Sequence, residues 1–130
     1  MIGAQATAAR RRLVIVVDDD RDTRDMLRMA LELEGYDVQL ASNGLRLIST
    51  LHAQPPDLIL LDVMMSWIDG YDLCRKLRQE TAFEATPVIM ISGRKHESAI
   101  KEGLSAGATD YFGKPLDMDR LLGRVRDLIG

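Results

Sequence analysis

The chain has 130 residues and a formal net charge of −3, from 17 basic and 20 acidic residues. This balance argues against direct nucleic-acid binding, for which a basic excess is expected. The single cysteine excludes an internal disulfide, and no apolar run approaches the ~20 residues that a membrane-spanning helix needs. We therefore expect one cytoplasmic domain without membrane contact.

The N-terminal part predicts a tail followed by a buried strand. Residues 1–12 are small and polar and end in three arginines, a composition typical of a flexible tail. Residues 13–17 are strongly β-branched, which favours a strand. That strand ends at the acidic run Asp18-Asp19-Asp20, so a hydrophobic strand carries carboxylates at its carboxyl end. We place the domain itself at residues 13–130.

Two helices and a short strand are predicted next. Asp20 is a suitable N-cap for a helix over 21–34. The strand covers residues 36–41, and a second helix begins at Gly44 and ends before Pro55, because a residue that precedes proline avoids the helical region. The residues predicted to face inward are Met26, Leu27, Ala30, Leu31 and Leu33 in the first helix and Leu47, Ile48 and Leu51 in the second.

Residues 58–62 are four large apolar residues followed directly by a carboxylate. Turn residues precede this run, so it is predicted to be a strand buried on both faces, as in a parallel sheet. An acid within the run would be costly to bury, whereas at its carboxyl end it lies in the crevice where open α/β sheets bind ligands. Asp62 is therefore the candidate reactive residue.

The second half of the chain continues the alternation of helices and strands. The predicted elements are a loop over 63–69, a helix over 71–79, a strand over 87–91, a helix over 96–106, a strand over 109–112 and a helix over 117–129. The residues predicted to be buried in these helices are Leu73, Cys74, Leu77, Ile100, Leu104, Leu121, Leu122, Val125 and Leu128. Five strand–helix pairs with short links predict a parallel sheet covered by helices on both faces.

Polar residues follow four of the predicted strands. They are Asp18 and Asp19, Asp62, Ser92 and Lys114. The carboxyl ends of parallel strands lie along one edge, so these side chains should converge. Carboxylates held close together favour a hard cation, Mg²⁺ first, with Mn²⁺ as the alternative. Together with a lysine and a hydroxyl, this is equipment for phosphoryl transfer, with Asp62 as the nucleophile.

At this point the sequence resembles a known family, the receiver domain of two-component response regulators. The resemblance covers about residues 13–129. The matching stretches are Val16-Val17-Asp18-Asp19, Pro56 to Met65, Asp69-Gly70, Pro87 to Ser92 and Gly107 to Pro115. It implies the flavodoxin-like (βα)5 fold, a three-layer α/β sandwich with strand order 2-1-3-4-5.

The resemblance also implies a chemistry for Asp62, which would accept a phosphoryl group from a sensor histidine kinase or a phosphotransfer protein. It assigns Mg²⁺ to Asp18, Asp19, Asp62 and the backbone carbonyl of Met64. The protein would then be a signalling switch that catalyses only its own phosphorylation and dephosphorylation.

The remaining implied roles concern the switch. Ser92 would hydrogen-bond the phosphoryl group and Lys114 would pair with it, aimed by a cis peptide bond before Pro115. Tyr111 would turn inward when Ser92 is drawn to the phosphate. The signal would pass to a downstream protein target through the face formed by the fourth helix, fifth strand and fifth helix.

Several residues depart from the family pattern or need another interpretation. Ser66 stands where the family often has proline, which leaves the loop after Asp62 freer. For Trp67 we favour packing against the following helix over an exposed partner anchor. His52 and His96 are expected at the surface, and Cys74 in the core.

Two alternatives remain open from the sequence. One is a phosphatase similar to the haloacid dehalogenases, in which Asp18 of the Asp18-Asp19-Asp20 run would be the nucleophile. The other is a pseudo-receiver that binds partners without being phosphorylated. Mapping the phosphorylated residue, Asp62 or Asp18, distinguishes the first alternative from the receiver. Undetectable phosphorylation despite Mg²⁺ binding would favour the second.

Overall fold

The computed structural model describes residues 11–130, and residues 1–10 lie outside it, with most of the predicted tail. Its strands are β1 (Leu13–Val17), β2 (Asp37–Ala41), β3 (Leu58–Asp62), β4 (Val88–Ser92) and β5 (Asp110–Gly113). Its helices are α2 (Arg21–Leu33), α3 (Gly44–Leu51), α4 (Gly70–Gln79), α5 (Glu97–Ser105) and α6 (Met118–Ile129), with a short 3-10 helix, η1 (Thr81–Phe83). Within residues 11–130, no helix combines the length and apolar character needed to cross a membrane.

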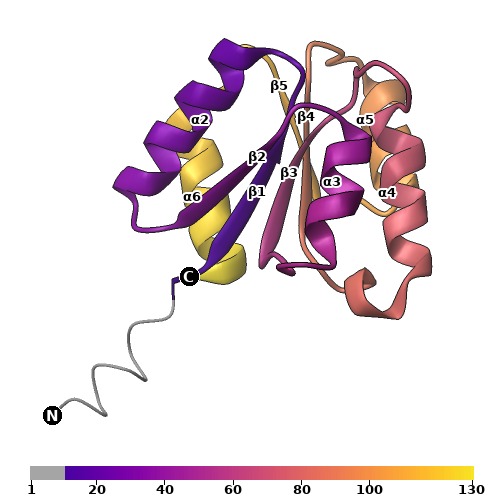
Figure 1. Ribbon diagram of the computed structural model, residues 1–130. Coiled ribbons are helices and arrows are strands. Elements are labelled where there is room, and N and C mark those ends of the chain that lie inside the picture. The colour runs from indigo at the N-terminus through magenta and orange to yellow at the C-terminus, as the bar shows by residue number, and fades with distance from the viewer. Residues whose placement is uncertain (1–10) are drawn as a thin grey trace, which may run out of the picture.

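The five strands form one parallel sheet in the order β2-β1-β3-β4-β5. Helices α2 and α6 cover one face of the sheet, and α3, α4 and α5 cover the other, giving three layers (Figure 1). The predicted fold class and strand order are therefore confirmed. Every residue of β1, β3 and β4 is buried, because these strands have neighbours on both sides and helices above and below.

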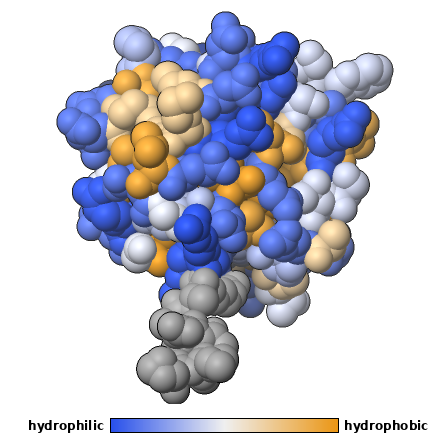
Figure 2. Space-filling model, turned by 60° about the vertical axis from the view of Figure 1, so that its left-hand side comes forward, coloured by the Kyte–Doolittle hydropathy of each residue, from blue (hydrophilic) through white to orange (hydrophobic). Residues whose placement is uncertain are grey.

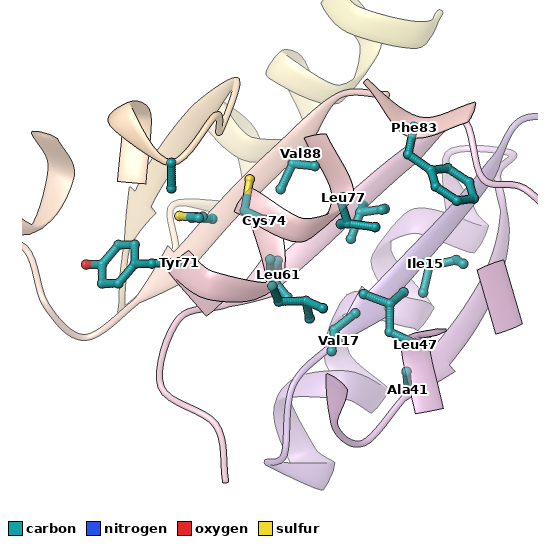
Figure 3. Packing of buried hydrophobic residues seen from close by; sticks show 14 of the residues in the cluster. Ile15, Val17, Ala41, Leu47, Leu61, Tyr71, Cys74, Leu77, Phe83 and Val88 are labelled. Atoms are coloured by element: carbon teal, nitrogen blue, oxygen red, sulfur yellow. The ribbon is translucent and has the colours of Figure 1, made fainter. Parts of the chain in front are cut away.

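The sheet separates two hydrophobic clusters. The cluster beneath α3, α4 and α5 packs Leu47, Cys74 and Leu77 against Ile15 and Leu61 of the strands (Figure 3). The opposite cluster includes Leu27 and Leu31 of α2 and Leu121 and Val125 of α6. Because strands alternate their side chains between the two faces, each central strand supplies residues to both clusters. This double packing fixes the strand ends from which the functional residues project.

Four residues predicted to face inward are exposed instead. Their exposed fractions are 46% for Met26, 81% for Leu33, 41% for Ile48 and 48% for Leu104. The buried face of α2 is centred on Leu27 and Leu31, which are one turn apart. Met26, the residue before Leu27, is rotated by about 100° around the helix axis away from that face. Hydrophobic and hydrophilic residues lie side by side on the surface seen in Figure 2.

Candidate functional site

Strands β1 and β3 bring three carboxylates together at the carboxyl edge of the sheet. Asp18 follows β1 and is fully buried, Asp62 ends β3 and is 4% exposed, and Asp19 is exposed. One oxygen from each carboxylate lies within 4.8 Å of the others. The sheet produces this convergence directly, because β1 and β3 are paired in parallel register and end at the same level.

Lys114 projects from the far side of this edge toward the two buried acids. Its Nζ lies 3.0 Å from Asp18 Oδ2 and 3.7 Å from Asp62 Oδ2. Burial alone would lower the pKa of Lys114, but the hydrogen bond to Asp18 and the charge of Asp62 outweigh it, so this pKa is raised. The lysine therefore remains charged and shared between two carboxylates.

Asp62 has a raised pKa. Burial is the main cause and the nearby Asp18 charge is the second, and together they raise the pKa of Asp62 to about 6. The backbone N–H of Met64, which donates to Asp62 Oδ1 at 3.1 Å, and the charge of Lys114 act in the opposite direction. One lysine thus leaves part of the repulsion between the acids uncompensated.

The donor set fits a hard divalent cation. The three carboxylates offer oxygen ligands only, which suits Mg²⁺ or Mn²⁺. A bound cation would stabilise the ionised form of Asp62, whose pKa is raised by burial and by the Asp18 charge. Beside Asp19, an open depression of about 380 Å³ gives access from solvent, and its lining includes Met64, Asp69 and Arg94.

A close backbone approach holds the loop over 63–69 against the end of β3. The N–H of Gly70 donates to the carbonyl of Val63 at 2.8 Å. A Cβ atom at Gly70 would lie only 2.7 Å from the Asp62 carbonyl oxygen, so glycine is required there. This contact keeps Met64 and its carbonyl next to Asp62.

Ser92 and Tyr111 are linked through the backbone of Arg94. Ser92 is fully buried, and its Oγ accepts a hydrogen bond from the Arg94 N–H at 3.0 Å. The Tyr111 hydroxyl donates to the Arg94 carbonyl at 2.7 Å. The Lys114 N–H donates to the Ser92 carbonyl at 2.7 Å, and the Lys114–Pro115 peptide bond is cis, the form that the resemblance implies.

Trp67 does not pack against the following helix, so that prediction is wrong. Its side chain is 89% exposed and its backbone has a φ of 79°, the left-handed region that favours glycine. The predictions that His52 and His96 lie at the surface and that Cys74 is buried are confirmed.

Sequence reasoning missed one residue that contacts the run Asp18-Asp19-Asp20 after β1, called the acidic loop below. Arg24 of α2 donates from Nη1 to the backbone carbonyl of Asp18 at 2.7 Å. The sequence carries little signal for such a contact, because the acceptor is a backbone group and arginine on a helix is usually solvated. Only the orientation of α2 on the sheet reveals it.

An open parallel sheet in the order 2-1-3-4-5 with an acidic crevice at its carboxyl edge defines a flavodoxin-like domain of the CheY type. The family model for the response regulator receiver domain matches residues 14–126. The response regulator MprA of Mycobacterium avium is 40% identical over 116 residues, 89% of this chain and 50% of the relative. The chain therefore spans about half the length of this curated relative.

Solved structures agree with this match. The receiver domain of the Francisella response regulator 1452 has a TM-score of 0.86 at 32% identity, covering 92% of this chain and 97% of that one. The Vibrio cholerae chemotaxis protein CheY4 has a TM-score of 0.86 at 26% identity, covering 92% and 99%. The chain belongs to the response regulator receiver domain family.

Proposed function

We propose that this domain is a phosphorylation-activated signalling switch in which Asp62 accepts a phosphoryl group. The donor is the phosphohistidine of a sensor histidine kinase or a phosphotransfer protein. The observation that carries the proposal is the environment of Asp62, a carboxylate 4% exposed at the end of a central strand, within reach of Lys114 and two further acids. Family membership supports the same chemistry.

The transfer step forms one bond and breaks one. A carboxylate oxygen of Asp62 attacks phosphorus, the phosphorus–nitrogen bond of the donor breaks, and the electron pair remains on the imidazole nitrogen. Asp18, Asp19, Asp62 and the Met64 carbonyl would hold Mg²⁺, which neutralises charge on the phosphoryl oxygens when it is bound. Lys114 then pairs with a phosphoryl oxygen in place of Asp62 Oδ2, and the Ser92 hydroxyl donates a hydrogen bond to a second phosphoryl oxygen.

The contacts around Arg94 give the switch a physical basis. In this structure the Arg94 N–H donates to the Ser92 hydroxyl oxygen at 3.0 Å. When the Ser92 hydroxyl turns to the phosphoryl group, this hydrogen bond breaks. The loop that carries Arg94 then moves, and the hydrogen bond between its carbonyl and Tyr111 breaks. Tyr111 turns inward, and the surface formed by α5, β5 and α6 changes for a downstream protein target.

Family membership favours Asp62 over Asp18 as the nucleophile and disfavours a haloacid-dehalogenase-like phosphatase. The geometry agrees, because Asp18 is fully buried and is paired more tightly than Asp62, whose Oδ2 lies 3.7 Å from Lys114 Nζ. Oδ1 accepts from the Asp20 N–H at 2.9 Å, and Oδ2 pairs with Lys114 at 3.0 Å. Asp18 is therefore poorly placed to attack phosphorus.

The test is the intact mass after incubation with Mg²⁺ and acetyl phosphate. Wild type should gain one phosphoryl group, and Asp62→Asn should gain none. Asp127→Asn, which replaces an exposed carboxylate on α6, is the matched control and should still be phosphorylated. An adduct that persists in Asp62→Asn would refute Asp62 as the acceptor. Absence of an adduct in every variant would support the pseudo-receiver instead.

A further inference from the structure

The acidic loop lies beyond the last paired residue of β1. Val17 is the end of the ladder with β2 and with β3. The N–H of Asp18 still reaches the Ala41 carbonyl at 3.2 Å, whereas the Asp18 carbonyl lies beyond the last strand pair with β3. Its acceptor capacity is satisfied by the Nη1 of Arg24 at 2.7 Å. Beyond the end of the strand pairing, an arginine side chain therefore supplies the hydrogen-bond donor for this carbonyl.

Arg24 is well placed to hold this carbonyl because α2 is anchored to the same loop. Asp20 caps the helix by accepting from the Thr23 N–H at 3.0 Å. The Arg24 N–H in turn donates to the Asp20 carbonyl at 3.1 Å. The arginine is half-buried, so its side chain has few alternative positions, and a charged donor strengthens the hydrogen bond.

The hydrogen bond from Arg24 also restrains the backbone of Asp19. The Asp18 carbonyl and the Asp19 N–H belong to one planar peptide group, so a bond that fixes the carbonyl also fixes the start of Asp19. The Asp19 carboxylate is exposed, and within residues 11–130 no side-chain hydrogen bond or ion pair holds it. Its direction toward the other two acids therefore depends on the backbone.

We propose that Arg24 is a positioning residue for the cation site, because it fixes the peptide between Asp18 and Asp19 and so directs the Asp19 carboxylate toward the ion. This inference rests on the proposed function. Arg24 contacts neither the ion nor the phosphoryl group and acts through the backbone, as residues that orient metal ligands do.

Removing Arg24 would change Mg²⁺ affinity in opposite directions through its charge and through its positioning of Asp19. A measurement of Mg²⁺ affinity can therefore test the proposal. Arg24 is a cation near the acidic cluster, and its charge alone opposes Mg²⁺ binding. If charge were its only role, its loss would tighten Mg²⁺ binding. If it positions Asp19, its loss weakens Mg²⁺ binding despite the removal of a positive charge.

The experiment compares Arg24→Met with wild type and with Arg28→Met, which removes an exposed arginine one turn further along α2. Mg²⁺ affinity is measured by calorimetry and by the fluorescence of Trp67, the single tryptophan, on the loop beside Met64. Loss of a group that orients a metal ligand typically weakens affinity about 10–100-fold, so Arg24→Met should bind at least ~10-fold more weakly. Arg28→Met should stay within about twofold of wild type, since it loses charge alone.

A conservative variant and a fold control complete the design. Arg24→Lys keeps the charge and one donor, so its Mg²⁺ affinity should lie between wild type and Arg24→Met. Thermal unfolding without Mg²⁺ verifies that each variant is folded. If Arg24→Met does not fold, Arg24→Gln, whose amide is too short to reach the Asp18 carbonyl, carries the same expectation. Equal or tighter Mg²⁺ binding by the variant overturns the proposal.

The two proposals fail in different ways. If wild type binds Mg²⁺ but gains no phosphoryl group, the proposed function fails, and the comparison of Mg²⁺ affinities still decides the role of Arg24. If wild type is phosphorylated and Arg24→Met binds Mg²⁺ as tightly as wild type, the role of Arg24 fails alone. Failure of wild type to bind Mg²⁺ overturns both.

Discussion

Replacing Asp62 with asparagine should stabilise the metal-free protein at neutral and alkaline pH, although it removes the proposed phosphoacceptor. Burial and the Asp18 charge raise the pKa of Asp62 from its usual 3.8 to about 6. A rise of about two pH units in a pKa corresponds to about 3 kcal/mol of free energy. Because the carboxylate is 4% exposed, little of this is screened by solvent. Asparagine keeps the shape and an acceptor for the Met64 N–H.

The sign follows from proton binding. Below pH 3.8 Asp62 is protonated in both the folded and the unfolded state, so the carboxylate contributes no instability. Between that pH and about 6 the unfolded chain releases the proton while the folded protein retains it, so the stability of wild type falls as pH rises. Asp62→Asn does not titrate, and its advantage in free energy of unfolding should therefore grow by up to about 3 kcal/mol and level off above about pH 7.

The assay is urea unfolding with EDTA across this pH range, with Asp127→Asn as the control for an exposed carboxylate. The difference between the control and wild type should stay small at every pH. Adding Mg²⁺ should narrow the gap for Asp62→Asn, because an ion at 100 times its dissociation constant stabilises the protein that binds it by about 2.7 kcal/mol. A constant difference between Asp62→Asn and wild type across the pH range would refute the electrostatic reasoning.

Three further substitutions test backbone conformation and packing. Trp67→Gly should raise the free energy of unfolding by about 0.5–1 kcal/mol, because a φ of 79° is strained for tryptophan and the side chain, 89% exposed, loses little burial. The measurement is urea unfolding followed by circular dichroism, and a loss of stability would contradict this reasoning. Gly103→Ala should destabilise by about 1 kcal/mol, because its new Cβ would lie 2.9 Å from Met90 Sδ and 2.9 Å from Tyr111 Cδ2. Gly123→Ala on α6, whose Cβ would have its nearest neighbour at 3.8 Å, should instead stabilise by about 0.5–1 kcal/mol. Equal effects of the two glycine substitutions would show that crowding at Tyr111 is absent.

Most of the architecture could be predicted from local patterns. The central strands are continuous apolar runs because both of their faces are covered, and such runs are visible in a sequence. Four of the five α-helices within residues 11–130 start at a residue that signals a helix start, since Asp20, Asn43, Asp69 and Asp117 cap them with their side chains. The errors lay at the edges of the buried helix faces, where Met26 and Leu33 are apolar but exposed. An apolar residue at the edge of such a face can lie on either side of it, and only the rotation of the helix decides.

The acids, the serine and the lysine of the site can be identified from sequence patterns alone. Alternating strands and helices force a parallel sheet, and a parallel sheet brings the residues after its strands to one edge. The tertiary structure decided how they meet: Lys114 lies 3.0 Å from Asp18 and 3.7 Å from Asp62, and Arg24 reaches the Asp18 carbonyl. It also decided the left-handed backbone of the exposed Trp67. These features depend on distances and loop closure between segments far apart in the chain, which no local pattern of residues encodes.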